Sequence, residues 1–122
     1  MNSHKDLDVW KKSMELVTNI YRLTRDFPQE ELYGLTSQIR RSAISIPSNI
    51  AEGAARNSVK EYMQFLYVSL GSISEIETQI LIAEKLGFLK VGHSLLEEVS
   101  AIRKMLTGLI SYVSKKQIPR KN

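Results

Sequence analysis

Apolar residues recur at helical spacing along nearly the whole chain, and this periodicity decides the fold class. In the last third of the sequence they are separated by alternating steps of four and three, which is the seam of a coiled-coil-like helix. The residues of this seam are Leu95, Val99, Ile102, Leu106, Leu109 and Val113. Six glycines and three prolines supply few turns, which disfavours a many-stranded sandwich or barrel. The spacing predicts four helices, at residues 6–25, 32–53, 58–86 and 91–115.

Residues at the ends of these segments agree with the helical pattern. Pro28 stops the first helix, and Gly53 is expected to cap the carboxyl end of the second. Asn57 or Ser58 can cap the amino end of the third helix. Glu61 stands three residues after Ser58, as it does in a capping box.

Four helices joined by short connections predict an all-α, up-down-up-down four-helix bundle. Because 122 residues make one domain, we expect the bundle over residues 1–114 and a basic C-terminal tail over residues 115–122. Pro47 lies inside the second helical pattern, where it removes one backbone donor. The apolar spacing continues in phase from Ile46 to Ile50, so we expect a Pro kink in the second helix rather than a break.

Side chains that carry catalysis or bind metals are scarce. Cysteine is absent, which excludes thiolate metal sites and cysteine nucleophiles and suits a reducing compartment. The two histidines are His4 and His93, and Lys90 stands where a Glu-x-x-His di-iron motif needs its glutamate. The glycines never form a phosphate-binding loop. We therefore expect no catalytic residue, no cofactor, no metal site and no enzymatic activity.

Segments that direct a protein to or across a membrane are also missing from the sequence. The first six residues contain no apolar h-region, and no apolar run approaches the roughly 20 residues that span a bilayer. We expect a cytoplasmic protein with no membrane partner.

The net charge of +4 is concentrated in the tail. The last eight residues hold four basic side chains and no acid, and the remaining basic and acidic residues balance at 13 each. Such a tail is either a solvated end or a nucleic-acid contact. In the second interpretation it would act with two basic residues near the head of the third segment. The candidate nucleic-acid-binding residues are Arg56, Lys60, Lys115, Lys116, Arg120 and Lys121.

A polar row lies beside the apolar face of the second segment. It consists of Gln38, Arg41, Ser45, Asn49 and Glu52, which fall within an arc of roughly 80° at 100° per residue. One interpretation is a recognition strip for phosphate or a peptide backbone. The other is a structural network, in which the row satisfies the carbonyl freed by Pro47 and Arg41 pairs with Glu52 or a neighbouring helix. We favour the structural network.

The third segment carries no charge from residue 62 to residue 74. A helix packed on one bundle normally shows water a charged side, so the stretch predicts burial against a second copy of the chain. Met63, Tyr67 and Leu70 are the candidate oligomer interface. The alternative is a helix central to its own bundle with a few exposed apolar residues.

Through several motifs, the sequence resembles the bacterial four-helix-bundle proteins called 23S ribosomal RNA intervening-sequence proteins. These motifs are LDVW at 7–10, FPQEELYGL at 27–35, QIRRSA at 38–43, SIPSNIAEG at 45–53 and GSISEIETQ at 71–79. The resemblance covers about residues 7–89 and implies a small bundle that assembles as a ring, commonly a homopentamer. It also implies a relation to the accessory variability determinant proteins of diversity-generating retroelements, which are basic pentamers that bind nucleic acid and a reverse transcriptase.

These observations predict a non-enzymatic, homo-oligomeric helical-bundle protein that binds RNA or DNA. The alternative is a protein-interaction scaffold that docks a partner protein such as a reverse transcriptase, without direct nucleic-acid binding. The neutral body departs from the basic retroelement branch, so the tail would supply the nucleic-acid contacts.

Overall fold

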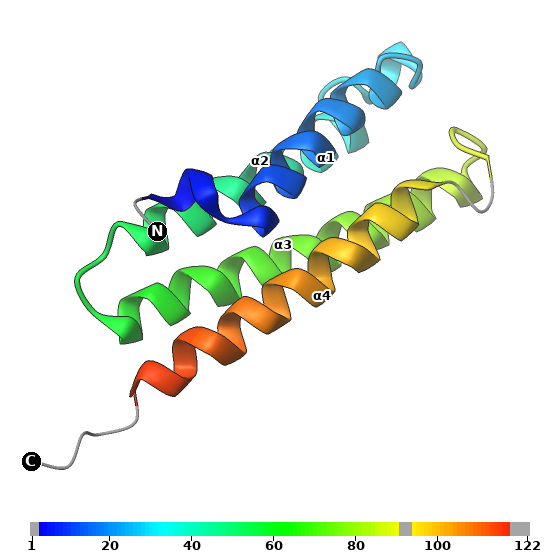
Figure 1. The fold of residues 1–122 in the computed structure, drawn as a ribbon. Helices are drawn as coiled ribbons and strands as arrows, with labels where there is room; N and C mark the ends of the chain where they lie inside the picture. Colours follow the sequence, from blue (N-terminus) through cyan, green and yellow to red (C-terminus); the bar gives the residue numbers. More distant parts are fainter. Residues whose placement is uncertain (1–2, 91–93, 118–122) are drawn as a thin grey trace, which may run out of the picture.

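The computed structural model describes residues 3–90 and 94–117 of the chain, which fold into helices without a strand in those ranges (Figure 1). This confirms the predicted all-α four-helix fold. The long helices are α1 (Asp8–Thr24), α2 (Leu35–Ala54), α3 (Val59–Lys85) and α4 (Ser94–Ser114). Three short 3-10 turns flank them, namely η1 (His4–Asp6), η2 (Gln29–Glu31) and η3 (Lys115–Gln117).

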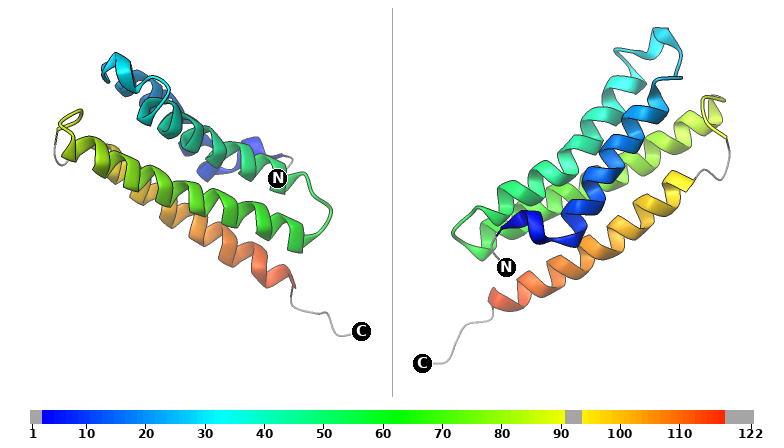
Figure 2. Two further views of the ribbon diagram at one scale, coloured as in Figure 1. Left: turned by 180° about the vertical axis from the view of Figure 1, so that it is seen from behind. Right: turned by 45° about the horizontal axis from the view of Figure 1, so that its top comes forward.

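Long helices that are consecutive in the sequence pack against each other, and α1 also contacts α4. The contact between α2 and α3 is the most extensive in the molecule, and that between α1 and α4 is the least extensive of the four. Figure 2 shows the resulting antiparallel arrangement from two further sides. The turn η1, the connection between α2 and α3, and η3 all lie at one end of the bundle, which we call the η3 end.

Apolar stripes from all four helices meet in one core. Isoleucine and leucine dominate it, because their branched side chains fill the space between helices at the density of a protein interior. Its largest fully buried members are Leu16, Ile20, Ile39, Ile46, Ile50, Leu66, Ile73, Ile76, Ile80, Leu95, Ile102 and Leu106. Near the end of α4 the buried residue is Ile110 rather than Leu109, which is only half-buried.

The helix ends follow the sequence signals in part. Ser58 caps α3, since its Oγ accepts a hydrogen bond of 3.1 Å from the Glu61 amide. The second helix begins three residues later than expected, because Gln29–Glu31 forms a separate turn and the Glu31 carboxylate accepts the Leu35 amide at 3.1 Å. The expected start of the fourth helix, at residue 91, lies outside the described residues.

Gly53 is not the cap that the sequence suggested, because α2 continues through it to Ala54. Its importance is steric. A Cβ at this position would lie 2.9 Å from the Phe65 Cβ and 3.0 Å from Cδ1 of Tyr62. Real Cβ atoms essentially never come that close, so the missing side chain lets the backbone of α2 approach α3.

The second helix also continues through Pro47, whose ring is buried. The predicted continuity of this helix is therefore confirmed. The kink expected at Pro47 stays a prediction.

We expect Gly53→Ala to lower the free energy of unfolding, although alanine favours helices. The overpacking against Tyr62 and Phe65 costs about 1 to 3 kcal/mol, which exceeds the gain of about 1 kcal/mol in helix propensity. Gly108→Ala is the matched control, because a Cβ on this residue of α4 meets nothing within 4 Å. Thermal or urea unfolding should show Gly108→Ala unchanged or more stable and Gly53→Ala less stable. Equal stabilisation of both variants would contradict the close approach.

Candidate functional site

The middle of the polar row on α2 forms hydrogen bonds within the bundle. Asn49 Nδ2 donates to the Ser45 carbonyl at 2.8 Å and to the Ser45 Oγ at 3.0 Å. From α3, the Ser72 hydroxyl donates to the Ser45 Oγ at 2.8 Å, and the Ser69 hydroxyl donates to the Ile46 carbonyl at 2.9 Å. The two bonds from α3 reach α2 just before Pro47, and Asn49 bonds back across Pro47 within α2. None of these bonds goes to the Ala43 carbonyl, which is the one that Pro47 leaves without its helical partner, so the middle of the row links α2 to α3 in a different way from the one expected.

The outer members of the row remain closer to solvent. Arg41 and Gln38 are exposed, and Arg41 Nη2 donates to the Ser37 hydroxyl at 3.3 Å. Glu52 does not pair with Arg41, as one interpretation of the row had it, because the two residues stand about 16 Å apart along α2. Glu52 pairs instead with Arg56, which follows the end of α2. The five residues of the row therefore do not converge on one binding site.

Basic side chains gather at the η3 end. Lys60 is exposed in the first turn of α3, and Lys115 and Lys116 are exposed in η3, which packs against α3. Lys116 Nζ lies 4.8 Å from the centre of the Tyr112 ring, a cation–π contact that leaves the ammonium at the surface. Within residues 3–90 and 94–117, no ion pair involves any of these three lysines.

Arg56 is held more firmly than the three lysines. Its guanidinium pairs with the Glu52 carboxylate and lies 4.8 Å from the centre of the Phe65 ring. Part of its charge is therefore already satisfied inside the subunit. The two remaining candidates for nucleic-acid binding, Arg120 and Lys121, lie outside the described residues.

The three candidate interface residues on α3 differ in exposure. Tyr67 is 55% exposed, whereas Met63 and Leu70 are half-buried and pack against the core of their own bundle. The exposed apolar surface of α3 extends further than these three residues. It includes Val68 at one end and Leu81 and Ile82 at the other.

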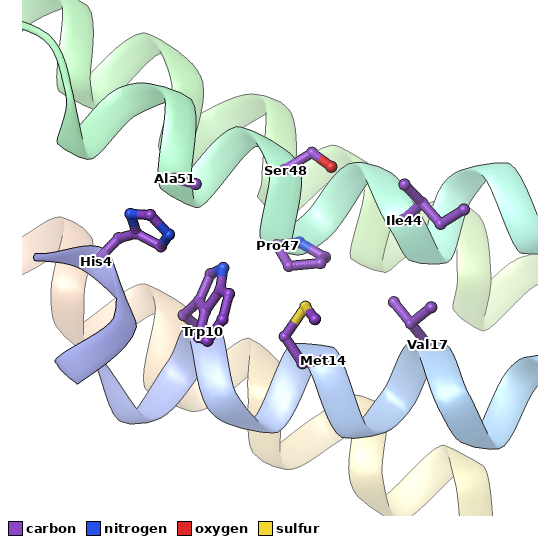
Figure 3. Close-up of a pocket in the computed structure, with 8 residues that line it drawn as sticks. All are labelled: His4, Trp10, Met14, Val17, Ile44, Pro47, Ser48 and Ala51. Atoms are coloured by element: carbon purple, nitrogen blue, oxygen red, sulfur yellow. The ribbon is translucent and has the colours of Figure 1, made fainter.

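A groove that the sequence analysis did not identify runs between α1 and α2 on the outside of the bundle (Figure 3). Its volume is about 370 Å³. The side chains that line it are mostly apolar, and the His4 ring packs edge-on against Trp10 with their centres 5.1 Å apart. The lining residues are His4, Trp10, Met14, Val17, Ile44, Pro47, Ser48 and Ala51. The available sequence signal was the second apolar row on α1, beside the core stripe, that contains Trp10, Met14 and Tyr21.

Side chains suited to catalysis or metal binding are sparse in the part of the chain that the structure describes. Among those residues, no three histidine, cysteine, aspartate or glutamate side chains come together where they would hold a metal ion. Burial raises the pKa of the Tyr62 phenol above its ordinary value, which moves this group further from titration at neutral pH. None of the described helices is both long enough and apolar enough to cross a bilayer.

Comparison with known protein families assigns the chain to one of them. The family model described as 23S rRNA-intervening sequence protein matches residues 5–108. The chain belongs to this family. The match confirms the resemblance and spans α1, α2, α3 and most of α4. It includes Arg56, Lys60 and every residue that lines the α1–α2 groove except His4. Lys115 and Lys116 lie beyond it. A comparison with curated proteins finds none that matches, and the relation to retroelement accessory proteins stays a prediction.

We expect Asn49→Ala to lower the free energy of unfolding by about 1 kcal/mol, because it removes two hydrogen bonds to Ser45 in a half-buried setting. Gln38→Ala is the control, since Gln38 belongs to the same polar row but is exposed. Urea unfolding of both variants measures the difference. An unchanged stability of Asn49→Ala together with a loss of ligand binding would make the row a recognition strip instead.

Proposed function

We propose that the protein is a non-enzymatic, homo-oligomeric helical bundle that binds RNA or DNA through the η3 end. The observation that carries the proposal is the cluster of Lys60, Lys115 and Lys116, which are exposed at one end and form no ion pair among the described residues. Free ammonium groups attract phosphates, and the release of counterions from the nucleic acid drives such binding.

Assembly would convert this modest cluster into a binding surface. One subunit offers three described lysines together with Arg120 and Lys121 of the sequence, which alone would bind weakly, since nonspecific affinities are typically about 10⁻⁴ to 10⁻⁶ M. Several clusters in one assembly act as linked sites and raise the affinity by roughly 100-fold or more. The proposed binding is therefore tolerant of sequence and strongly dependent on salt.

Self-association is supported by the outer surface of α3. Tyr67 and Val68 are each more than half exposed, and Leu81 and Ile82 are also exposed about four turns further along the helix. Exposed apolar surface of this length on one helix is typical of an interface. The resemblance to ring-forming bundles agrees with this interpretation, and a homopentamer is the assembly that it implies.

A second candidate function is a scaffold that docks a partner protein, such as a reverse transcriptase, without touching nucleic acid. The apolar α1–α2 groove favours it, because a groove of this kind suits an amphipathic helix. Salt dependence separates the two functions, since phosphate contacts weaken steeply as salt rises and an apolar docking contact does not.

We expect the triple variant Lys60→Gln, Lys115→Gln and Lys116→Gln to lose at least tenfold in affinity for a short single-stranded RNA at low salt. The slope of log affinity against log salt should also fall by about one for each lost phosphate contact. Fluorescence anisotropy at two salt concentrations measures both quantities. Removal of residues 115–122 should weaken binding at least as much, because it also removes Arg120 and Lys121.

The matched control for that experiment removes three cations from the opposite end, in the variant Arg25→Gln, Lys85→Gln and Lys90→Gln. It should bind RNA as the wild type does. Equal losses in both triple variants would mean that net charge, rather than the η3 end, attracts nucleic acid. No binding by the wild type at low salt would favour the scaffold.

We also expect light scattering at micromolar concentration to give a mass that is a multiple of the 13.9 kDa chain. Tyr67→Lys should shift the protein towards the monomer, because an unpaired charge inside an apolar contact costs several kcal/mol. Tyr112→Lys is the control, since Tyr112 is similarly exposed but lies on α4. A wild-type mass of one chain would overturn self-association.

A further inference from the structure

Two exposed surfaces of the subunit carry large apolar side chains and are similar in length but different in shape. The first is the α1–α2 groove, and the second is the outer side of α3, which we call the α3 face. The α3 face consists of Tyr67, Val68, Gly71, Ser74, Glu75, Thr78, Leu81 and Ile82. We propose that the α1–α2 groove of one subunit receives the α3 face of a second copy of the chain. The inference rests on the proposed self-association and assigns the two surfaces that meet.

The groove is longer than the part shown in Figure 3. A second hollow of about 390 Å³ continues it towards the connection between α1 and α2, and Ile44 lines both hollows. The lining of the second hollow includes Tyr21, Leu32 and Tyr33, and Tyr33 is 93% exposed. Along α2 the two hollows extend from Ser37 to Ala51, which is a length of about 21 Å at 1.5 Å per residue.

The α3 face has the length and the relief to fill this groove. From Tyr67 to Ile82 it is about 22 Å long at the same rise per residue. Large apolar side chains stand at its two ends. Its middle is polar, with Glu75 beside three smaller residues, and it borders a hollow of about 390 Å³. A Cβ added to Gly71 would meet nothing within 4 Å, so this part of the helix leaves room for a neighbouring helix.

The charges on the two surfaces are complementary. The residues that line the two hollows include no carboxylate but do include Arg40 and Arg41. Arg40 is already engaged inside its own subunit, since its Nε donates to the Thr24 hydroxyl and its guanidinium lies over the Tyr21 ring. In contrast, the sequence between Lys60 and Lys85 contains no lysine or arginine, and Glu75 is exposed in the centre of the α3 face. Glu75 lines a small hollow together with Arg41 of its own subunit but forms no ion pair with the part of the chain described, so its carboxylate can also accept a cation of the neighbouring subunit.

The pairing joins two unlike surfaces and is therefore heterologous. A two-fold dimer would instead match each surface with itself. Pairing of unlike surfaces leaves one free groove and one free α3 face on every dimer. Each addition then repeats the same contact, and the assembly ends as a ring where the rotation between neighbours closes.

Complementation between two variants tests this pairing directly. Ile44→Asp places a carboxylate in the groove, and Val68→Asp places one on the α3 face; both side chains are about half exposed, so the fold should survive. Each variant alone is expected to be monomeric, because every contact would contain one damaged surface. An equimolar mixture should give a 1:1 heterodimer and nothing larger, since only one intact groove and one intact face can meet. Native mass spectrometry of isotopically distinguished chains measures the stoichiometry.

Tyr112→Asp is the control variant, because Tyr112 is exposed on α4 and belongs to neither surface; it should assemble like the wild type. Circular dichroism of each variant confirms that the helices remain. A wild-type protein that is monomeric overturns self-association itself. A wild type that assembles while Ile44→Asp assembles equally well, or a mixture of the two variants that stays monomeric, overturns only the assignment of the surfaces.

Discussion

The close approach of α2 to α3 is the constraint on which the rest of the bundle depends. It is possible because Gly53 has no side chain where Phe65 and Tyr62 press against the helix. Two serine hydroxyls of α3 then donate hydrogen bonds to α2, at the Ile46 carbonyl and the Ser45 hydroxyl. Since α2 and α3 form the most extensive contact in the molecule, their packing sets where α1 and α4 can lie.

The packing of α2 on α3 also explains which surfaces of the bundle remain exposed to solvent. Small and flat residues of α2, including Pro47 and Ala51, face away from α3 and form one wall of the α1–α2 groove. On the far side of the pair, α3 keeps Tyr67 and Ile82 exposed because α4 covers only part of its circumference. The subunit therefore presents two unlike surfaces with exposed apolar side chains, one beside α2 and one on α3.

The same antiparallel topology brings together charges that are distant in sequence. Lys60 begins α3 and Lys115 follows α4, and both lie at the η3 end because successive helices reverse direction. Arg56 reaches the same end but is held by Glu52 and Phe65, so it contributes less free charge than its position in the sequence suggested. The nucleic-acid surface that we propose would depend on assembly, because each subunit supplies few cations.

The sequence by itself determined the four helices, their order and most of the core, because helical periodicity is a local property that single segments carry. It also placed the amino-terminal cap of the third helix at Asn57 or Ser58, of which the structure shows Ser58. Contacts between segments were decided by the tertiary structure. Ile110 rather than Leu109 is buried because a straight helix drifts from a strict seven-residue repeat. The pair of Glu52 with Arg56, in contrast, follows from local spacing, since these residues are one turn apart whereas Arg41 lies about 16 Å from Glu52 along the helix. Gly53 serves close packing rather than a cap, because steric fit between helices depends on distances that the linear pattern does not contain.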